Sequence, residues 1–258
     1  MPTDIETSRA FVKERTEKTR AAQATLSTDS AWTWPGKTLA AWDADINAMD
    51  ATVPASLAKN TQAFEVDMLA ARGILDARFD LIHKYTLLTV GVMRVRAATL
   101  PGLRDIVDDL SARGDSRRAV EEEADSLLAA WEEWEQQLLT TFSPAPGKTL
   151  ADFKIYLEGG LLPGGPPLPA LPTLKKTYKA ALTKWRRSEG QLNALYSRCE
   201  DECVAWYGEA TAVWPAGTAE GDMIRGQVPT DYNPPTPAPP APPAPPTPPT
   251  PPPVPPVP

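Results

Sequence analysis

The prolines of this chain gather at one end and divide it into two parts that must fold differently. Residues 234–258 hold 17 of the 30 prolines, most of them in Pro-Pro-X triplets. Proline fixes φ near about −65° and has no N–H, so this tail cannot form a helix or a sheet. Polyproline II repeats every three residues and would place the small X residues on one face. We predict a polyproline II tail whose contact stripe consists of Ala238, Ala241, Ala244, Thr247 and Thr250.

The rest of the chain has the composition of a helical protein. Leucine, alanine and charged residues are plentiful, and two long stretches, 56–98 and 173–213, contain no proline. Each stretch is followed by a proline, Pro101 or Pro215, which predicts the end of a helix. At 1.5 Å per residue each helix would be about 60 Å long.

A six-residue sequence occurs twice and indicates an internal duplication. Pro-Gly-Lys-Thr-Leu-Ala stands at 35–40 and again at 146–151, an offset of 111 residues (146 − 35). Each copy is expected to hold a medium, a short and a long helix. We therefore predict an all-α fold in which two tandem three-helix units form one elongated bundle. The predicted divisions are repeat one at 1–112, repeat two at 113–221, a linker at 222–233 and the tail at 234–258.

The long helices carry patterns typical of helix packing. From Tyr178 to Trp206, apolar residues alternate at spacings of four and three, which is the seam of a helix packed on another helix. Subtracting 111 predicts the matching seam on 56–98. Arg78 and Glu189 interrupt the two seams at the same place. Because a buried charge needs a partner, we predict that these two residues face each other or share a polar centre between the long helices.

The repeated Gly-Lys-Thr invites comparison with a phosphate-binding loop, but the sequence does not support one. That loop needs a further glycine five residues earlier and a preceding strand, whereas Ala31 and Phe142 stand at those positions. Thr38 and Thr149 are suitable helix N-caps after a Pro-Gly turn. We interpret both copies as helix-start signals.

No metal, cofactor or catalytic group is predicted. Cys199 and Cys203 share a helix face and could supply half of a metal site. Their counterparts at the 111 offset, Leu88 and Val92, are apolar, which favours core packing. His83 is the only histidine, and no nucleophile or acid is visibly arranged with it.

Charge limits the classes of partner and location. A net charge of −7 argues against nucleic acid and anionic membrane surfaces as partners. The sequence shows no 18-residue apolar run, so no membrane span is expected. It also shows no signal peptide. Cytoplasmic location is the default, with signal-independent export left open. Residues 116–140 are rich in acid and the start of 173–213 is rich in lysine and arginine, so the two blocks can pair within or between molecules.

These features favour a structural protein that is not an enzyme. The leading expectation is a self-assembling scaffold or filament subunit, a homo-oligomer whose tail docks on neighbouring subunits. The alternative is an adaptor whose tail enters the aromatic groove of an SH3-like domain, although no lysine or arginine flanks the tail. A third class is an enzyme or nucleotide-dependent switch, with the Gly- and Pro-rich loop 159–172 as a lid.

Overall fold

The structure is a computed structural model that describes residues 4–110, 114 and 116–229, and within them it is all-α apart from one two-residue strand pair. The prediction of an all-α protein is confirmed. The expected polyproline II tail and its stripe, Ala238 to Thr250, lie outside the described residues.

The helices follow one another in two similar sets. The first set is α1 (Asp4–Asp29), α2 (Leu39–Met49), α3 (Leu57–Ala97) and α4 (Arg104–Asp108), with a 3-10 turn at Pro101–Leu103 before α4. The second set is α5 (Arg117–Leu138), α6 (Leu150–Glu158), α7 (Leu171–Val213) and α8 (Ala219–Gln227). The predicted linker is therefore wrong at its beginning, because residues 222–227 belong to α8.

Both short helices begin as the repeated hexapeptide predicts. The Thr38 hydroxyl accepts a hydrogen bond from the Ala41 amide, and the Thr149 hydroxyl accepts one from the Asp152 amide. Asp152 returns a bond by accepting from the Thr149 amide at 2.9 Å, which completes a capping box. The Gly-Lys-Thr sequence thus satisfies backbone donors that the first turn of a helix leaves open.

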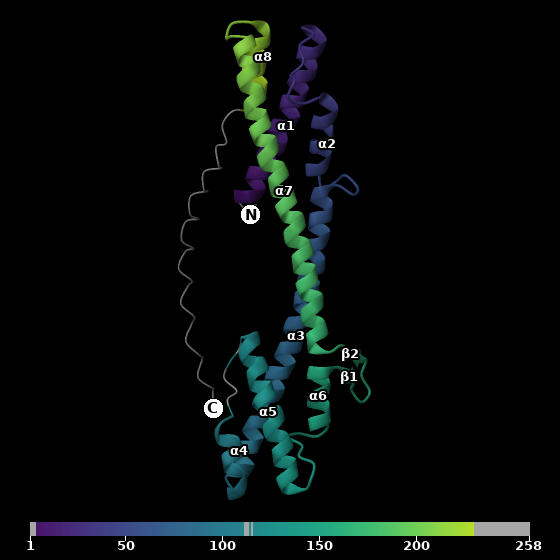
Figure 1. Cartoon of the computed structure of the whole chain (residues 1–258), viewed down its shortest axis with the longest axis vertical. Helices are drawn as coiled ribbons and strands as arrows, with labels where there is room; N and C mark the ends of the chain where they lie inside the picture. The colour runs from purple at the N-terminus through teal and green to yellow at the C-terminus, as the bar shows by residue number, and fades with distance from the viewer. Residues whose placement is uncertain (1–3, 111–113, 115, 230–258) are drawn as a thin grey trace, which may run out of the picture.

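The molecule is a rod with a helical bundle at each end and a two-helix waist (Figure 1). α3 and α7 run antiparallel along it, as shown by a 2.7 Å hydrogen bond between the Thr61 and Ser188 hydroxyls and a 3.1 Å bond from Arg78 to the Pro169 carbonyl. α1, α2 and α8 pack on the last part of α7, and α4, α5 and α6 pack on the last part of α3.

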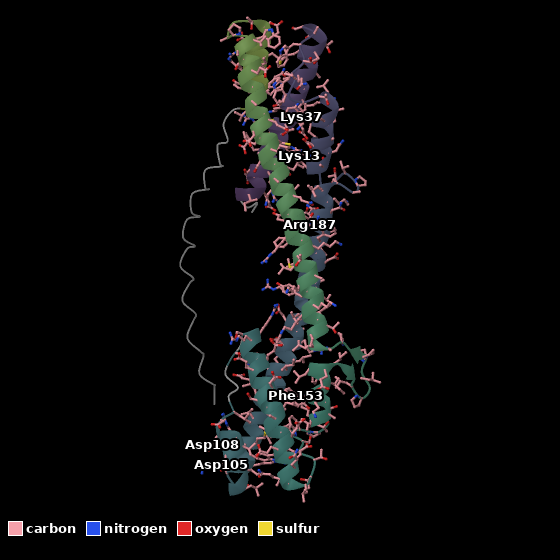
Figure 2. The ribbon with its side chains drawn as sticks, in the orientation of Figure 1. Lys13, Lys37, Asp105, Asp108, Phe153 and Arg187 are labelled. Atoms are coloured by element: carbon pink, nitrogen blue, oxygen red, sulfur yellow. The ribbon has the colours of Figure 1, made fainter. Side chains whose placement is uncertain are left out.

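Each end therefore combines helices from both sets. The core of one end contains Trp42 of α2 and Trp206 of α7, and the core of the other contains Trp131 and Trp134 of α5. All four indole side chains are fully buried, as expected for core residues. Figure 2 places Lys37 and Lys13 at the first end, Phe153 at the second and Arg187 near the waist.

Burial on the two long helices matches at an offset of 113 residues. Every buried residue of α7 has a buried counterpart in α3 at this offset. The α7 residues are Leu171, Leu174, Ser188, Leu192, Leu195, Cys199, Cys203, Trp206 and Ala210, and the α3 residues are Ala58, Thr61, Leu75, Phe79, Ile82, Thr86, Val90, Met93 and Ala97.

The seam predicted for α3 at an offset of 111 is therefore only partly correct. Its members Arg78 and Tyr85 are buried, but Ile74, Leu81, Leu88 and Val95 are exposed by 58, 48, 37 and 73%. A residue turns about 100° around a helix, so an error of two residues moves a seam by about 200°, to the opposite face. The extra residues lie between the short and long helices, where residues 159–170 take the place of the shorter segment 50–56.

Candidate interaction surface

The exposed members of the predicted α3 seam form a row of large apolar side chains on the surface. We call Ile74, Leu81, Leu88 and Val95 the α3 stripe. They recur every seven residues, so they line one face of α3, and all four side chains are exposed. A shallow groove of about 460 Å³ lies on this face beside Leu88 and Val95. Rows of large apolar side chains facing water are typical of interaction sites.

The corresponding face of α7 provides an internal comparison. At the 113 offset the α3 stripe matches Arg187, Ala194, Asp201 and Gly208, which are also exposed. The two faces therefore occupy equivalent positions on equivalent helices, yet only the α3 face is lined by large apolar residues. Folding does not require large apolar residues there, so the α3 stripe calls for another explanation.

A buried polar cluster lies at the other end of the rod. The Lys37 ammonium forms ion pairs with Asp45 and Glu202 and lies 4.0 Å from the centre of the Trp42 ring. Burial lowers the pKa of Lys37, but hydrogen bonds to Asp45 and Glu202 outweigh this effect and raise it above its ordinary value of 10.5. The cluster joins the turn before α2 to α7, two segments 165 residues apart in sequence.

The same cluster has the donor atoms of a metal site. Ligand atoms of Asp45, Cys199 and Glu202 lie within 4.8 Å of one another. Burial raises the pKa of the Cys199 thiol to about 12, which disfavours the thiolate that a metal would need. Because the Lys37 ammonium and the Arg198 guanidinium together balance the charges of the two carboxylates, we interpret the cluster as a structural ion-pair network.

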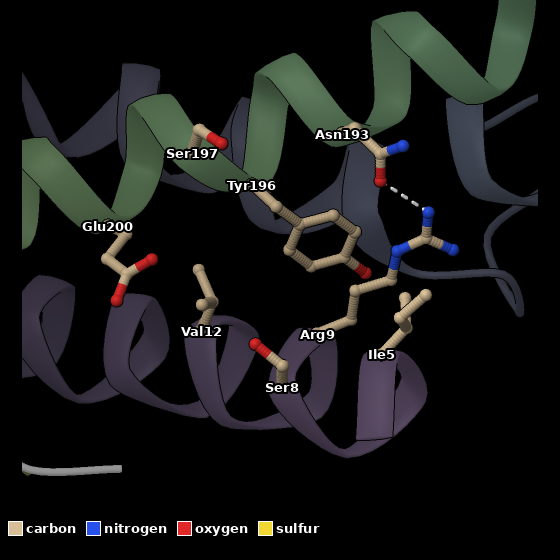
Figure 3. Close-up of a pocket in the computed structure, with 8 residues that line it drawn as sticks. All are labelled: Ile5, Ser8, Arg9, Val12, Asn193, Tyr196, Ser197 and Glu200. Atoms are coloured by element: carbon tan, nitrogen blue, oxygen red, sulfur yellow. Dashed lines mark hydrogen bonds between the residues drawn. The ribbon is translucent and has the colours of Figure 1, made fainter. Parts of the chain in front are cut away.

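An open groove of about 390 Å³ lies between α1 and α7 (Figure 3). Arg9 crosses it and donates to the Asn193 side-chain oxygen at 2.5 Å, and it also pairs with Glu189. Ser8 and Ser197 supply hydroxyls to its wall, and Glu200 supplies a carboxylate. The arginine in the groove is already paired with side chains of α7.

The structure places the two predicted seam charges apart. Arg78 donates to the backbone carbonyls of Tyr156 at 2.9 Å and Pro169 at 3.1 Å, near the start of α7. Glu189 pairs with Arg9 of α1. The expected pairing of Arg78 with Glu189 is therefore not present. The antiparallel course of α3 and α7 explains the difference, since it sends equivalent positions of the two helices to opposite sides of the waist.

The Gly- and Pro-rich loop forms a small hairpin that Arg78 contacts. Within residues 159–170 the strands β1 (Gly160–Leu161) and β2 (Pro167–Leu168) pair in antiparallel fashion. Gly159 has φ +84°, and a Cβ there would lie 2.6 Å from the Ala170 nitrogen, so only glycine fits. The Arg78 bond to Pro169 holds this small hairpin on α3, which does not resemble a lid.

The other sequence candidates have structural places. Cys199 and Cys203 are fully buried, which confirms that they pack in the core. His83 is half-buried on α3. One pair of the opposed charge blocks meets within the molecule, where Lys175 of α7 lies 2.7 Å from Glu121 of α5. Sequence reasoning missed the role of Lys37, although its recurrence in the hexapeptide marked the position.

Comparison with known proteins adds no functional information. The chain matches no protein-family profile, no curated protein and no solved structure. Among the residues that the structure describes, no helix combines the length and apolarity needed to cross a membrane.

Proposed function

We propose that this chain is a structural subunit that self-assembles, with its proline-rich tail docking on neighbouring subunits. The observation that carries the proposal is the α3 stripe, a row of four large apolar side chains exposed on a rod-shaped helical scaffold. Exposing such a row to water is unfavourable, and burying it on association recovers roughly 25 cal/mol for each Å² of apolar surface covered.

The proposal includes an origin by duplication of one helical unit. The order medium, short, long, short occurs in both sets of helices, the two short helices start 111 residues apart, and burial on the long helices agrees at 113. In this view the two units form the rod, and the tail, 234–258, is an addition to it. Its triplets are expected to form an extended strip that docks at little cost in ordering entropy.

The first test is direct observation of assembly. Sedimentation velocity across a wide concentration range is expected to show species heavier than the 27.9 kDa chain, and negative-stain microscopy is expected to show rods joined into larger particles. A chain that sediments as a 27.9 kDa monomer at every concentration, and gives single rods on the grid, would refute self-assembly.

A further inference from the structure

Two of the three positions between the members of the α3 stripe are small, and Gly91 has no close neighbour in the described part of the chain that requires it. Gly91 lies inside α3, where glycine costs roughly 0.5–1 kcal/mol relative to alanine. A Cβ built on Gly91 would meet no atom within 4 Å. The glycine therefore does not accommodate any neighbour within the described part of the chain. Ala77 is also small and exposed, and it lies on the same face.

We propose that the α3 stripe pairs with the α3 stripe of a second copy of this chain, antiparallel, across a two-fold axis near residue 86. This inference rests on the proposed function and names the surface through which two subunits first join. A two-fold contact uses the same patch on both subunits, so the patch must be complementary to itself. The sequence of α3 can be tested for that property.

When two copies of α3 are placed antiparallel, large residues of one copy face small residues of the other. If facing residues have numbers that add to 172, each layer but one sets a large residue against a small one. The layers are Ile74 with Ala98, Ala77 with Val95, Leu81 with Gly91, and Lys84 with Leu88, and all eight residues are exposed. In the remaining layer the aliphatic stem of Lys84 can cover Leu88 while its ammonium reaches water.

The flanks of the stripe are complementary in charge in the same antiparallel arrangement. Asp80 and Arg94 each immediately precede a stripe residue, Leu81 and Val95. Their numbers add to 174, so Asp80 of each copy lies two residue steps, or about 3 Å along the axis, from Arg94 of the other, and the side chains span this offset to give two equivalent ion pairs. Arg94 also donates to the Leu110 carbonyl of its own chain and keeps further N–H donors for this pair. Leu87, exposed by 45%, lies at the same small offset from the Leu87 of the second copy, at the centre. A parallel pair would instead set Asp80 near Asp80 and lose this complementarity.

The run from Ile74 to Ala98 is long enough for a specific helix pair. It covers 24 residue steps, or about 36 Å at 1.5 Å per residue. It ends at the last turn of α3, and on the other side Asp67 replaces the apolar residue that the seven-residue spacing would place there. The equivalent face of α7 is a poorer partner for the α3 stripe. Pairing would remove water from the charged Arg187 and Asp201 without placing an opposite charge beside them.

The pairing is tested by placing glutamate on the stripe and, as a matched control, on the equivalent face of α7. In the full chain, Leu81→Glu with Val95→Glu is expected to raise the dimer dissociation constant about 100-fold or more, because each carboxylate would face an apolar layer, at Gly91 and at Ala77. Ala194→Glu with Gly208→Glu changes the exposed positions 113 residues later and is expected to leave the dissociation constant unchanged. Sedimentation equilibrium measures both, and circular dichroism checks that each variant keeps its helices.

Two outcomes separate this inference from the proposed function. If the wild type assembles and the stripe variant assembles equally well, α3 pairing is wrong while self-assembly stands. If the wild type is monomeric at every concentration, self-assembly and α3 pairing are both wrong.

A cysteine at the centre tests the geometry. Leu87→Cys is expected to give a disulfide-linked dimer under mild oxidation, whereas Leu81→Cys is expected to do so only in a parallel pair. The native Cys199 and Cys203 are buried and do not interfere. Cross-linking of Leu81→Cys without cross-linking of Leu87→Cys would overturn the antiparallel arrangement.

Exchanging the two flanking charges is a second check of the pairing. Asp80→Arg alone is expected to weaken the dimer about tenfold, and adding Arg94→Asp is expected to restore it.

Discussion

Lys37 and Lys148 hold the same place in the repeated hexapeptide, yet their side chains have different surroundings. The Lys37 ammonium is buried between Asp45 and Glu202, whereas the Lys148 ammonium lies 4.5 Å from the centre of the Tyr85 ring. The position before the N-cap thus supplies a lysine to both short helices. Among the described residues, carboxylates contact this lysine only at the first end, where it joins α2 to α7 through ion pairs.

Replacing Lys37 is expected to weaken the first end of the rod. Lys37→Met leaves Asp45 and Glu202 close together, although Arg198 still lies 2.7 Å from Asp45. We expect a loss of about 2 kcal/mol, below the usual cost of breaking a buried pair because that arginine remains. The matched variant Lys148→Met loses a cation–π contact and is expected to cost at most about 1 kcal/mol. Equal effects in urea unfolding would contradict the structural role of the ion-pair network.

The raised pKa of Lys37 adds a pH dependence to this prediction. A group whose pKa is higher in the folded state stabilises the protein fully below its ordinary pKa, here 10.5, and loses that effect as pH rises through the folded-state pKa. The difference in unfolding free energy between wild type and Lys37→Met should therefore be constant from about pH 7 to 9 and shrink above about pH 10.5. A difference that grows with pH in this range would contradict it.

At the scale of the helices, sequence patterns predicted the elements well and the register of one of them poorly. Proline and capping signals located the ends of the long helices and the starts of α2 and α6 within a few residues. The α7 seam was also correct, since Leu192, Cys199, Cys203 and Trp206 are buried. The α3 seam was only partly correct because α3 has two apolar faces, and a sequence alone cannot say which one the rest of the chain covers. The partners of Arg78 were not predictable either, because backbone carbonyls leave no mark in the sequence.

Arg78 and Glu189 have different partners, so their replacements are expected to act independently. The two side chains share no partner, so the effects of Arg78→Met and Glu189→Met on unfolding free energy are expected to add. Arg78→Met alone should cost about 2–3 kcal/mol, because two carbonyls lose a charged donor. Arg9→Met and Glu189→Met are expected to couple by about 0.5–1 kcal/mol, since that pair is partly hydrated. Coupling between Arg78 and Glu189 would contradict the structure.

At the scale of the whole molecule, the two end bundles depend on one another because each borrows a long helix from the other set. α1 and α2 pack on α7, and α5 and α6 pack on α3. Neither set can complete its bundle alone, and the α3–α7 waist holds the two ends at a fixed separation. The α3 stripe lies on the last part of α3, at one end of the rod, whereas α8 lies at the other end.

This arrangement predicts two separable levels of assembly. Residues 234–258 hold 17 prolines and no apolar period that could join a helical core, so their deletion is expected to leave helix content and melting temperature unchanged. If α3 forms the dimer and the tail joins dimers, the deletion should leave a dimer of twice 27.9 kDa, less the tail, and abolish larger particles. The stripe variant, Leu81→Glu with Val95→Glu, should instead lose the dimer itself. Sedimentation of the two variants side by side measures this order.

The tail stripe gives the sharper form of the same test. Glutamate at Ala238, Ala241 and Ala244 keeps every proline, and therefore the extended backbone, but puts charge along one face of a three-residue helix. Loss of the larger particles, as in the deletion, is expected if that face makes the contact. A tail of the same composition in scrambled order is the control for length and proline content, and it should also fail. If both the glutamate and the scrambled tails support normal assembly, the tail is only a spacer and its docking on neighbouring subunits is ruled out.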